Sequence, residues 1–270
     1  MTTLAPSTSL RMSALQALMV TCPLEKAKVV KQLGHGLAPD ARPFNPQEHI
    51  DEPAGLPGRP ALPLLVHPSR LKNRAVGTPE GRAALIHSLA HIEANAVNLA
   101  LDLVWRFDGL PEAFYADWLQ VAREEALHFQ LLNDHLQTLG FAYGDFPAHD
   151  GLWEMAEKTR HDLLARLALV PRTLEARGLD VTPAIQTKLT SVGDRAAVAI
   201  LDVILRDEIG HVAVGNHWYR HLCAAGGLDP IQTYASLATT FGARALQGPF
   251  NLVARRAAGF DEAELALLGA

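Results

Sequence analysis

Two Glu-x-x-His pairs within long helical patterns constrain the fold of this chain most strongly. A glutamate and a histidine at this spacing lie about one helical turn apart, so both can reach one ion on the same side of the helix. A single glutamate precedes each pair by a nearly equal stretch of chain, so the two halves repeat one pattern. In chain order the residues are Glu93, Glu125, His128, Glu175, Glu208 and His211.

These acids lie among apolar residues, where a charge is costly. Glu93, for example, shares a helical face with Leu89 and Val97. An ionised carboxylate is seldom buried unless it is paired or binds a metal ion. Four glutamates and two histidines in this order are typical of a four-helix bundle that holds two metal ions in its interior. Oxygen-rich ligation with two imidazoles favours iron, with manganese as the alternative.

Four long helical patterns contain these residues, and strand-like alternation is nearly absent. Their approximate ranges are 78–109, 111–139, 151–177 and 182–223. Thr78 followed by Pro79 is typical of a helix start. We therefore predict an all-α chain built around a four-helix bundle.

The last two of these patterns contain helix-breaking residues. Pro171 should kink the third helix, because proline lacks a backbone N–H and clashes with the preceding turn. Gly178 is expected to end that helix, and Thr182-Pro183 to begin the fourth. A further interruption is expected near Gly193.

Shorter segments flank the bundle. Recurring prolines after the first two helices predict an extended arm rather than a helix or a strand. We predict two parts of one structural unit: N-terminal helices and arm over 1–78, packed on a bundle with a helical extension over 79–270. The short helices are expected at 10–20, 24–33, 230–241 and 261–268, and the arm at 34–78.

The second half of the arm is locally basic. Arg70, Lys72 and Arg74 lie close together there. They are candidate contacts for an anionic substrate if they lie at the mouth of a cavity. The alternative is a solvated arm without a binding role.

An acid directly precedes each Glu-x-x-His pair. These acids are Glu124 and Asp207. Each could accept the free ring N–H of the histidine in the other half, which pairs Asp207 with His128 and Glu124 with His211. Simple surface exposure is the alternative for both acids, and also for Glu175, which follows Pro171 by about one turn.

Composition indicates the cellular compartment in which the protein is expected. No apolar run approaches the roughly 20 residues that span a bilayer, and the net charge of −5 argues against general attraction to nucleic acid. The two cysteines, Cys22 and Cys223, form no CxxC motif. We therefore expect a cytoplasmic protein without a membrane span.

Several motifs together resemble a known family. They are His67–Ala75, Ala90–Ala96, Arg123–His128, Pro171–Asp180, Arg206–His211 and Gly248–Asn251. These segments look like the bacterial ferritin-like proteins grouped as a domain of unknown function, DUF455, over nearly the whole chain. The resemblance implies a ferritin-like bundle with a di-metal carboxylate centre at the six residues named above. The layout is also distantly similar to that of the di-iron tRNA hydroxylases.

Three functions fit a di-metal bundle. The first is an oxygen-activating oxidoreductase that hydroxylates or oxidises an unknown small-molecule or RNA substrate, with O2 and an electron donor as partners. The second is iron handling or peroxide detoxification, as in ferritins and rubrerythrins. The third is a non-enzymatic metal-binding protein. The first is favoured because a storage protein has no need of the extended arm. We expect a homodimer, whereas iron storage would require a closed shell of many copies.

Overall fold

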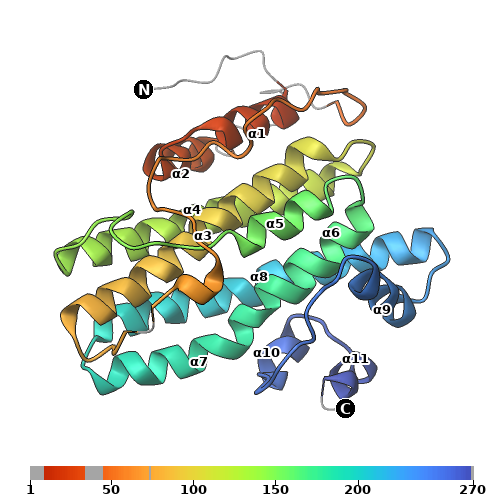
Figure 1. Ribbon diagram of the computed structural model, residues 1–270. Helices are drawn as coiled ribbons and strands as arrows, with labels where there is room; N and C mark the ends of the chain where they lie inside the picture. The colour runs from red at the N-terminus through yellow and green to blue at the C-terminus, as the bar shows by residue number, and fades with distance from the viewer. Residues whose placement is uncertain (1–8, 34–44, 73, 269–270) are drawn as a thin grey trace. The chain divides into compact units, whose positions relative to one another are not determined.

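The protein is helical in the part of the chain that the structure describes. This computed structural model describes residues 9–33, 45–72 and 74–268 (Figure 1). Within those ranges, β-type pairing is limited to an isolated bridge between Leu65 and Ala148. The predicted all-α fold class is confirmed.

The chain divides into two compact units, Met1–Asp150 and Gly151–Ala270. The helices of the first unit are α1 (Leu10–Met19), α2 (Pro23–Gln32), the 3-10 helix η1 (Pro68–Arg70), α3 (Pro79–Arg106) and α4 (Glu112–Thr138). The helices of the second unit are α5 (Gly151–Lys158), α6 (Leu163–Leu169), η2 (Val170–Glu175), α7 (Ala176–Ser191), α8 (Arg195–Ala225), α9 (Pro230–Thr240), α10 (Leu252–Ala257) and α11 (Glu262–Leu267). The domain division predicted from the sequence, 1–78 and 79–270, stays a prediction.

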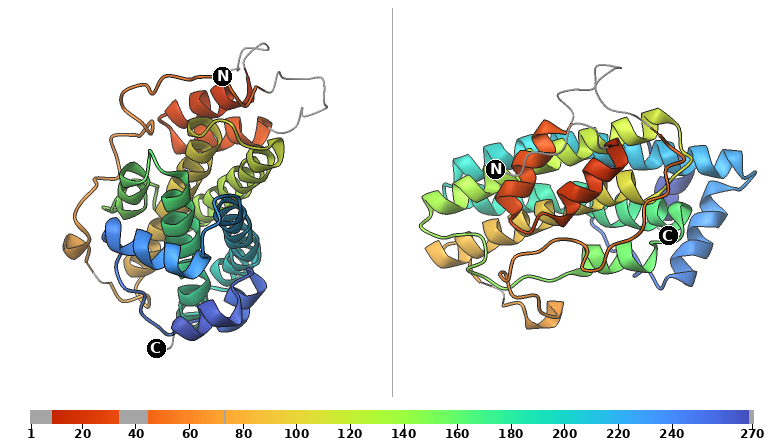
Figure 2. Two further views of the ribbon diagram at one scale, coloured as in Figure 1. Left: turned by 90° about the vertical axis from the view of Figure 1, so that its right-hand side faces the viewer. Right: turned by 90° about the horizontal axis from the view of Figure 1, so that it is seen from above.

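A pair of long helices, α3 and α4, forms the centre of the first unit. α1 packs against α3 and α2 against α4, and Figure 2 shows these short helices on one side of the long pair. Thr78 begins α3 as predicted, because its hydroxyl accepts a hydrogen bond from the N–H of Gly81 at 3.0 Å. α4 ends before Gly140, whose φ of +83° suits the residue that follows a helix.

The segment between α2 and α3 has no α-helix over residues 45–72 and 74–78. Residues 34–44 of the predicted arm lie outside the described residues. The N–H of Gly58 donates to the carbonyl of Leu18 at 2.9 Å. A Cβ at this glycine would lie 2.1 Å from the carbonyl oxygen of Met19, so a larger residue would push the segment away. The arm is thus held against the end of α1 at Gly58.

The third predicted helix is broken in two places. The chain leaves α5 and enters α6 after Asp162, whose carboxylate accepts from the N–H of Ala165 at 2.9 Å. At Pro171 the helix widens into the π-helix η2. A π-helix leaves room for a residue that cannot join the regular hydrogen-bond ladder, which agrees with the predicted disturbance at this proline.

α7 continues where the sequence predicted a helix end at Gly178 and a new start at Thr182-Pro183, so both predictions are wrong. Pro183 cannot donate the usual hydrogen bond to the carbonyl of Leu179. The side-chain amide of Asn251 donates to that carbonyl instead, at 3.2 Å. The donor comes from far along the chain, which a local sequence pattern does not reveal.

α8 begins after Gly193, whose φ is +75°, so the predicted interruption there is confirmed. Asp194 caps the helix by accepting from the N–H of Ala197 at 3.0 Å. Farther along, a Cβ at Gly215 would lie 2.6 Å from Cβ of Pro171. The glycine therefore allows α8 to approach η2 closely.

The last helices complete the apolar core of the second unit. α9 and α11 fall within the ranges predicted for them, but α10 was not predicted. Asn251 caps α10 by accepting from the N–H of Ala254 at 3.1 Å. The fully or nearly buried members of this core are Ala176, Leu179, Val212, Ala254, Ala258, Phe260 and Leu265.

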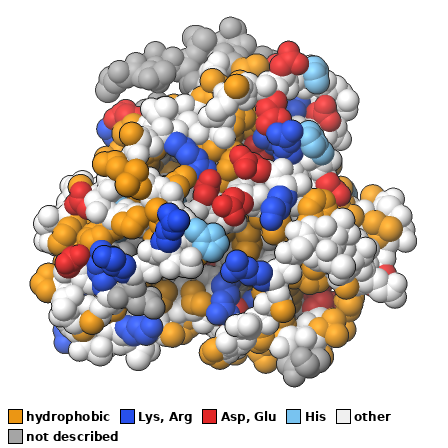
Figure 3. Space-filling view, in the orientation of Figure 1, with side chains coloured by type: hydrophobic (Ala, Val, Ile, Leu, Met, Phe, Trp, Pro, Cys, Tyr) orange, Lys and Arg blue, Asp and Glu red, His pale blue; other side chains and the backbone are white. Residues whose placement is uncertain are grey.

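The surface carries both apolar and charged side chains. Among the helices that the structure describes, none combines the length and apolarity needed to cross a membrane. On the face shown in Figure 3, Lys and Arg side chains lie scattered among apolar and acidic ones.

Candidate metal centre

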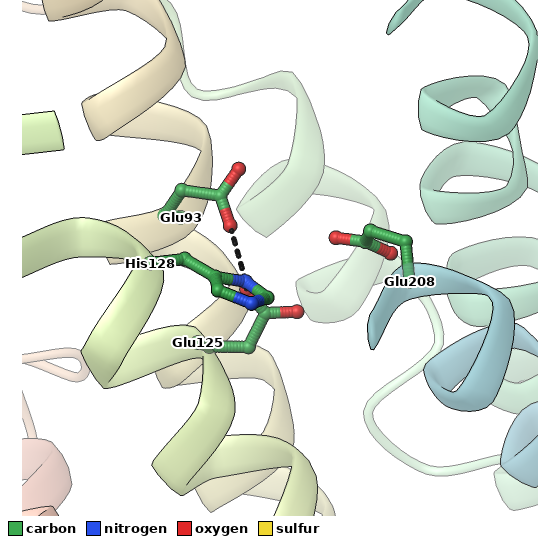
Figure 4. Close-up of side chains that lie close together, drawn as sticks. All are labelled: Glu93, Glu125, His128 and Glu208. Carbon is green, nitrogen blue, oxygen red and sulfur yellow. Dashed lines mark hydrogen bonds and ion pairs between the residues drawn. The ribbon is translucent and has the colours of Figure 1, made fainter. Parts of the chain in front are cut away.

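Three side chains meet in the interior of the first unit, one from α3 and two from α4. They are Glu93, Glu125 and His128, with exposed fractions of 4%, 0% and 0% for the whole residues. Nδ1 of His128 lies 3.2 Å from Oε2 of Glu93 and 3.3 Å from Oε2 of Glu125. Figure 4 draws the first contact as a dashed line. One ligand atom of each residue lies within 4.8 Å of the others, so the set could hold a metal ion.

Helical periodicity explains this convergence. Glu125 and His128 lie three residues apart, so both side chains project from the same face of α4. Ala90, Ala122 and Ala126 are buried on the same two helices.

The three groups change one another's protonation. Burial, and then the negative charge of Glu125, raise the pKa of Glu93 to about 8. Burial lowers the pKa of His128, but hydrogen bonds and charge attraction from Glu125 and Glu93 outweigh it and raise that pKa to about 12. The two carboxylates repel each other where little water offsets their charge. A bound cation would remove this repulsion, so the donor set fits a metal ion.

The second Glu-x-x-His pair lies on α8 in the second unit. Both residues are buried, Glu208 with 8% and His211 with 1% of its surface exposed. Nδ1 of His211 lies 3.9 Å from Oε2 of Glu208. Nδ1 is therefore the ring nitrogen near the carboxylate in this pair, as it is in His128. Figure 4 also draws the Glu208 side chain on its helix.

Glu175 is half-buried at the end of η2. It therefore lies on a different element of the second unit from Glu208 and His211. Its role as a metal ligand stays a prediction.

The acids that precede the two pairs are half-buried and make local contacts. Glu124 accepts a hydrogen bond from Nε2 of Gln120 at 2.6 Å. Asp207 accepts from the guanidinium of Arg206 at 2.8 and 3.2 Å. The predicted pairing of these acids with His128 and His211 stays a prediction.

The three basic residues of the arm precede α3 in the chain. Arg70 and Lys72 are exposed, whereas Arg74 is half-buried. Nε of Arg74 donates to Glu80 at 3.1 Å, and its guanidinium lies 5.2 Å from the ring centre of Phe146. Part of this basic cluster is therefore engaged within the first unit, and its role in substrate binding stays a prediction.

Comparison with known proteins agrees with the sequence motifs. Residues 19–266 match the family model described as "Protein of unknown function (DUF455)". A protein of Haemophilus influenzae, described as uncharacterized, is 48% identical over 260 residues, which cover 92% of this chain and 90% of that protein. No solved structure matches the chain. The chain belongs to the DUF455 family.

Proposed function

We propose that this protein is a di-iron oxidoreductase that uses O2 to hydroxylate or oxidise a substrate. The main support is the buried cluster of Glu93, Glu125 and His128 in the first unit. Glu208 and His211 of the second unit have the same spacing in the chain, and Nδ1 of His211 is likewise the ring nitrogen near the carboxylate. We propose that α3 and α4 join α7 and α8 in a ferritin-like four-helix bundle around two metal ions.

The proposed ligand set has four carboxylates and two imidazoles. Hard oxygen donors with imidazole suit iron or manganese, whereas a closed thiolate set would favour zinc. Glu175 would add the fourth carboxylate from η2, and a π-helix often occurs at a functional site. The proposed ligands are Glu93, Glu125, His128, Glu175, Glu208 and His211.

The chemistry of such a site depends on both the metal and the protein. When bound, the ferrous pair supplies the electrons for O2 activation. The protein keeps Glu93 and Glu125 out of bulk water, so their charges act strongly on a bound cation. The hydrogen bonds that Nδ1 of His128 donates to Glu93 and Glu125 hold this ring nitrogen toward the two carboxylates.

The partners of this reaction are also proposals. Besides O2, the protein needs an electron donor and a substrate, which we propose is a small molecule or an RNA. An anionic substrate would meet the exposed Arg70 and Lys72 of the arm, with Arg74 beside them. A homodimer is the proposed assembly.

Metal analysis and oxygen uptake test the proposed function. We expect protein purified without added metal to contain iron, and anaerobic ferrous loading to reach about two ions per chain. Exposure to air should then consume O2 and produce a transient absorption band. Zinc alone, or no metal together with no O2 uptake, would contradict the proposal.

Two further outcomes identify the alternatives. Bound iron that neither consumes O2 nor changes oxidation state would indicate a non-enzymatic metal-binding protein. A closed shell of many copies in a sedimentation experiment would indicate iron storage. A monomer or dimer with O2 uptake would agree with the oxidoreductase.

A further inference from the structure

A cavity lies within the second unit. Its volume is about 360 Å³, which is within the range of small-molecule sites. α9, the segment that follows it, and residues of η2, α10 and α11 form its walls. The lining that matters here consists of Arg172, Tyr234, Phe250, Arg255, Phe260 and Leu268.

Arg172 is buried in this wall, with 4% of its surface exposed. Its Nη2 donates to the carboxylate of Glu264. Nε and Nη1 are buried and have no hydrogen-bond acceptor among the described residues. The guanidinium lies 4.5 Å from the ring centre of Tyr219 and 5.1 Å from that of Phe260. Aromatic faces attract the charge but are weak acceptors for its N–H groups.

Arg255 provides a second buried guanidinium. Nε and Nη2 donate to Asp180 at 3.0 and 2.7 Å. Nη1 is buried without an acceptor in the described part of the chain. Its guanidinium also lies 5.3 Å from the ring centres of Phe250 and Phe260. Two arginines of one cavity lining therefore each keep N–H groups that their own carboxylate partners do not use.

The balance of charge around the cavity favours an anion. Glu264 accepts from both Arg172 and Arg220, so one carboxylate serves two guanidinium groups. Arg244 adds a further positive side chain to the lining. Buried donors without acceptors are costly, and an anion that accepts from them would relieve that cost.

We propose that this cavity binds a small organic carboxylate with an apolar body, whose carboxylate accepts hydrogen bonds from Arg172 and Arg255. A planar carboxylate matches the fork of a guanidinium. The rings of Tyr234, Phe250 and Phe260 would surround the apolar body. Binding to this cavity can be measured on the metal-free protein and is therefore independent of the proposed metal centre.

Calorimetric titration with three probes tests the ligand class. The probes are octanoate, octyl phosphate and octanol, which share one apolar body and differ in the head group. We expect octanoate to bind at least about tenfold more tightly than octanol. Equal binding of octanol would refute the anion site, and tighter binding of octyl phosphate would refute the carboxylate assignment. Failure of octanoate to bind at millimolar concentration would refute the proposal.

A matched pair of variants on α9 tests the location. Ala238 lines the cavity, whereas Ala235 on the same helix is exposed and does not line it. Ala238→Trp should fill the cavity and weaken octanoate binding by at least about tenfold, while Ala235→Trp should leave it within about twofold. Equal affinities in the two variants would place the ligand elsewhere.

Arg172→Lys tests the guanidinium. This variant keeps the positive charge beside Glu264 but loses the fork that matches a carboxylate. We expect weaker octanoate binding with an unchanged circular dichroism spectrum. Unchanged affinity would show that Arg172 does not hold the carboxylate.

Discussion

The side chains of Glu93 and Glu125 have their charges close together in a space that excludes water. Nδ1 of His128 lies 3.2 Å from an oxygen of Glu93 and 3.3 Å from one of Glu125. The attraction of both carboxylates for the protonated ring, which raises the pKa of His128, offsets part of their repulsion. Such an arrangement of acids is costly to a fold unless it performs a function or binds a cation. The repulsion between these two buried carboxylates is the physical basis of the proposed metal centre.

Individual acids should differ sharply in their effect on metal content. Glu125→Ala and Glu208→Ala each remove a proposed ligand, so we expect both variants to lose most of their iron. Glu124→Ala changes an adjacent acid that contacts Gln120, and it should keep much of its iron. Elemental analysis of the three purified variants measures this difference. Equal iron in all three would refute the ligand assignment.

A buried lysine should make stability depend on pH. Lys26 donates to the carbonyls of Leu18 and Gly58 at 2.9 and 3.1 Å. Burial, and then the positive charge of Arg59, lower the pKa of Lys26 from 10.5 to about 7. Between these values the unfolded chain binds a proton that the folded protein does not. The free energy of unfolding should therefore rise with pH in this window, by up to about 1.4 kcal/mol per pH unit.

Urea unfolding of wild type and Lys26→Met between pH 7 and 10.5 checks this dependence. The variant loses hydrogen bonds and should be less stable at the alkaline end. Between pH 7 and 10.5 the free energy of unfolding of the variant should increase less with pH than that of the wild type, because the variant has no Lys26 to titrate. Parallel curves for the two proteins would show that Lys26 keeps an ordinary pKa.

At the scale of elements, α7 depends on a contact with the start of α10. Asn251 donates to the carbonyl of Leu179, which the missing N–H of Pro183 leaves without its usual helical donor. Asn251→Ala should lower the free energy of unfolding by about 1–3 kcal/mol, because it leaves this carbonyl unsatisfied and removes the cap of α10.

A double-mutant cycle isolates the first of these effects. Pro183→Ala restores a backbone N–H that can donate to Leu179. In that background, Asn251→Ala should cost about 1 kcal/mol less than it does in the wild type. Urea unfolding of the four proteins measures the coupling. An equal cost in both backgrounds would show that Asn251 does not replace the missing donor.

At the scale of the whole molecule, metal binding should stabilise the fold. A ligand that binds only the folded protein adds about 2.7 kcal/mol at a concentration of one hundred times its Kd. Anaerobic ferrous loading should therefore raise Tm by about 5 °C or more. Scanning calorimetry of the metal-free and loaded forms measures the shift. Glu125→Ala is the control and should show little change, whereas an equal rise in that variant would indicate binding elsewhere.

The pattern of proposed ligands was readable from the sequence because a charged residue on an apolar helical face is unusual. Periodicity predicted that Glu93, Glu125 and Glu208 are buried, and the structure finds all three buried. Capping residues such as Thr78 likewise predicted the start of α3. These features depend on neighbours within one or two helical turns.

Sequence alone thus determined the helical class and the acids and histidines that helical spacing aligns, because these follow from local periodicity. Only the tertiary structure decided that α7 passes through Pro183, since the replacing donor is Asn251. It alone also brought Arg172 and Arg255 to one cavity. Both results depend on groups far apart in the chain, and local patterns do not specify which distant groups will meet.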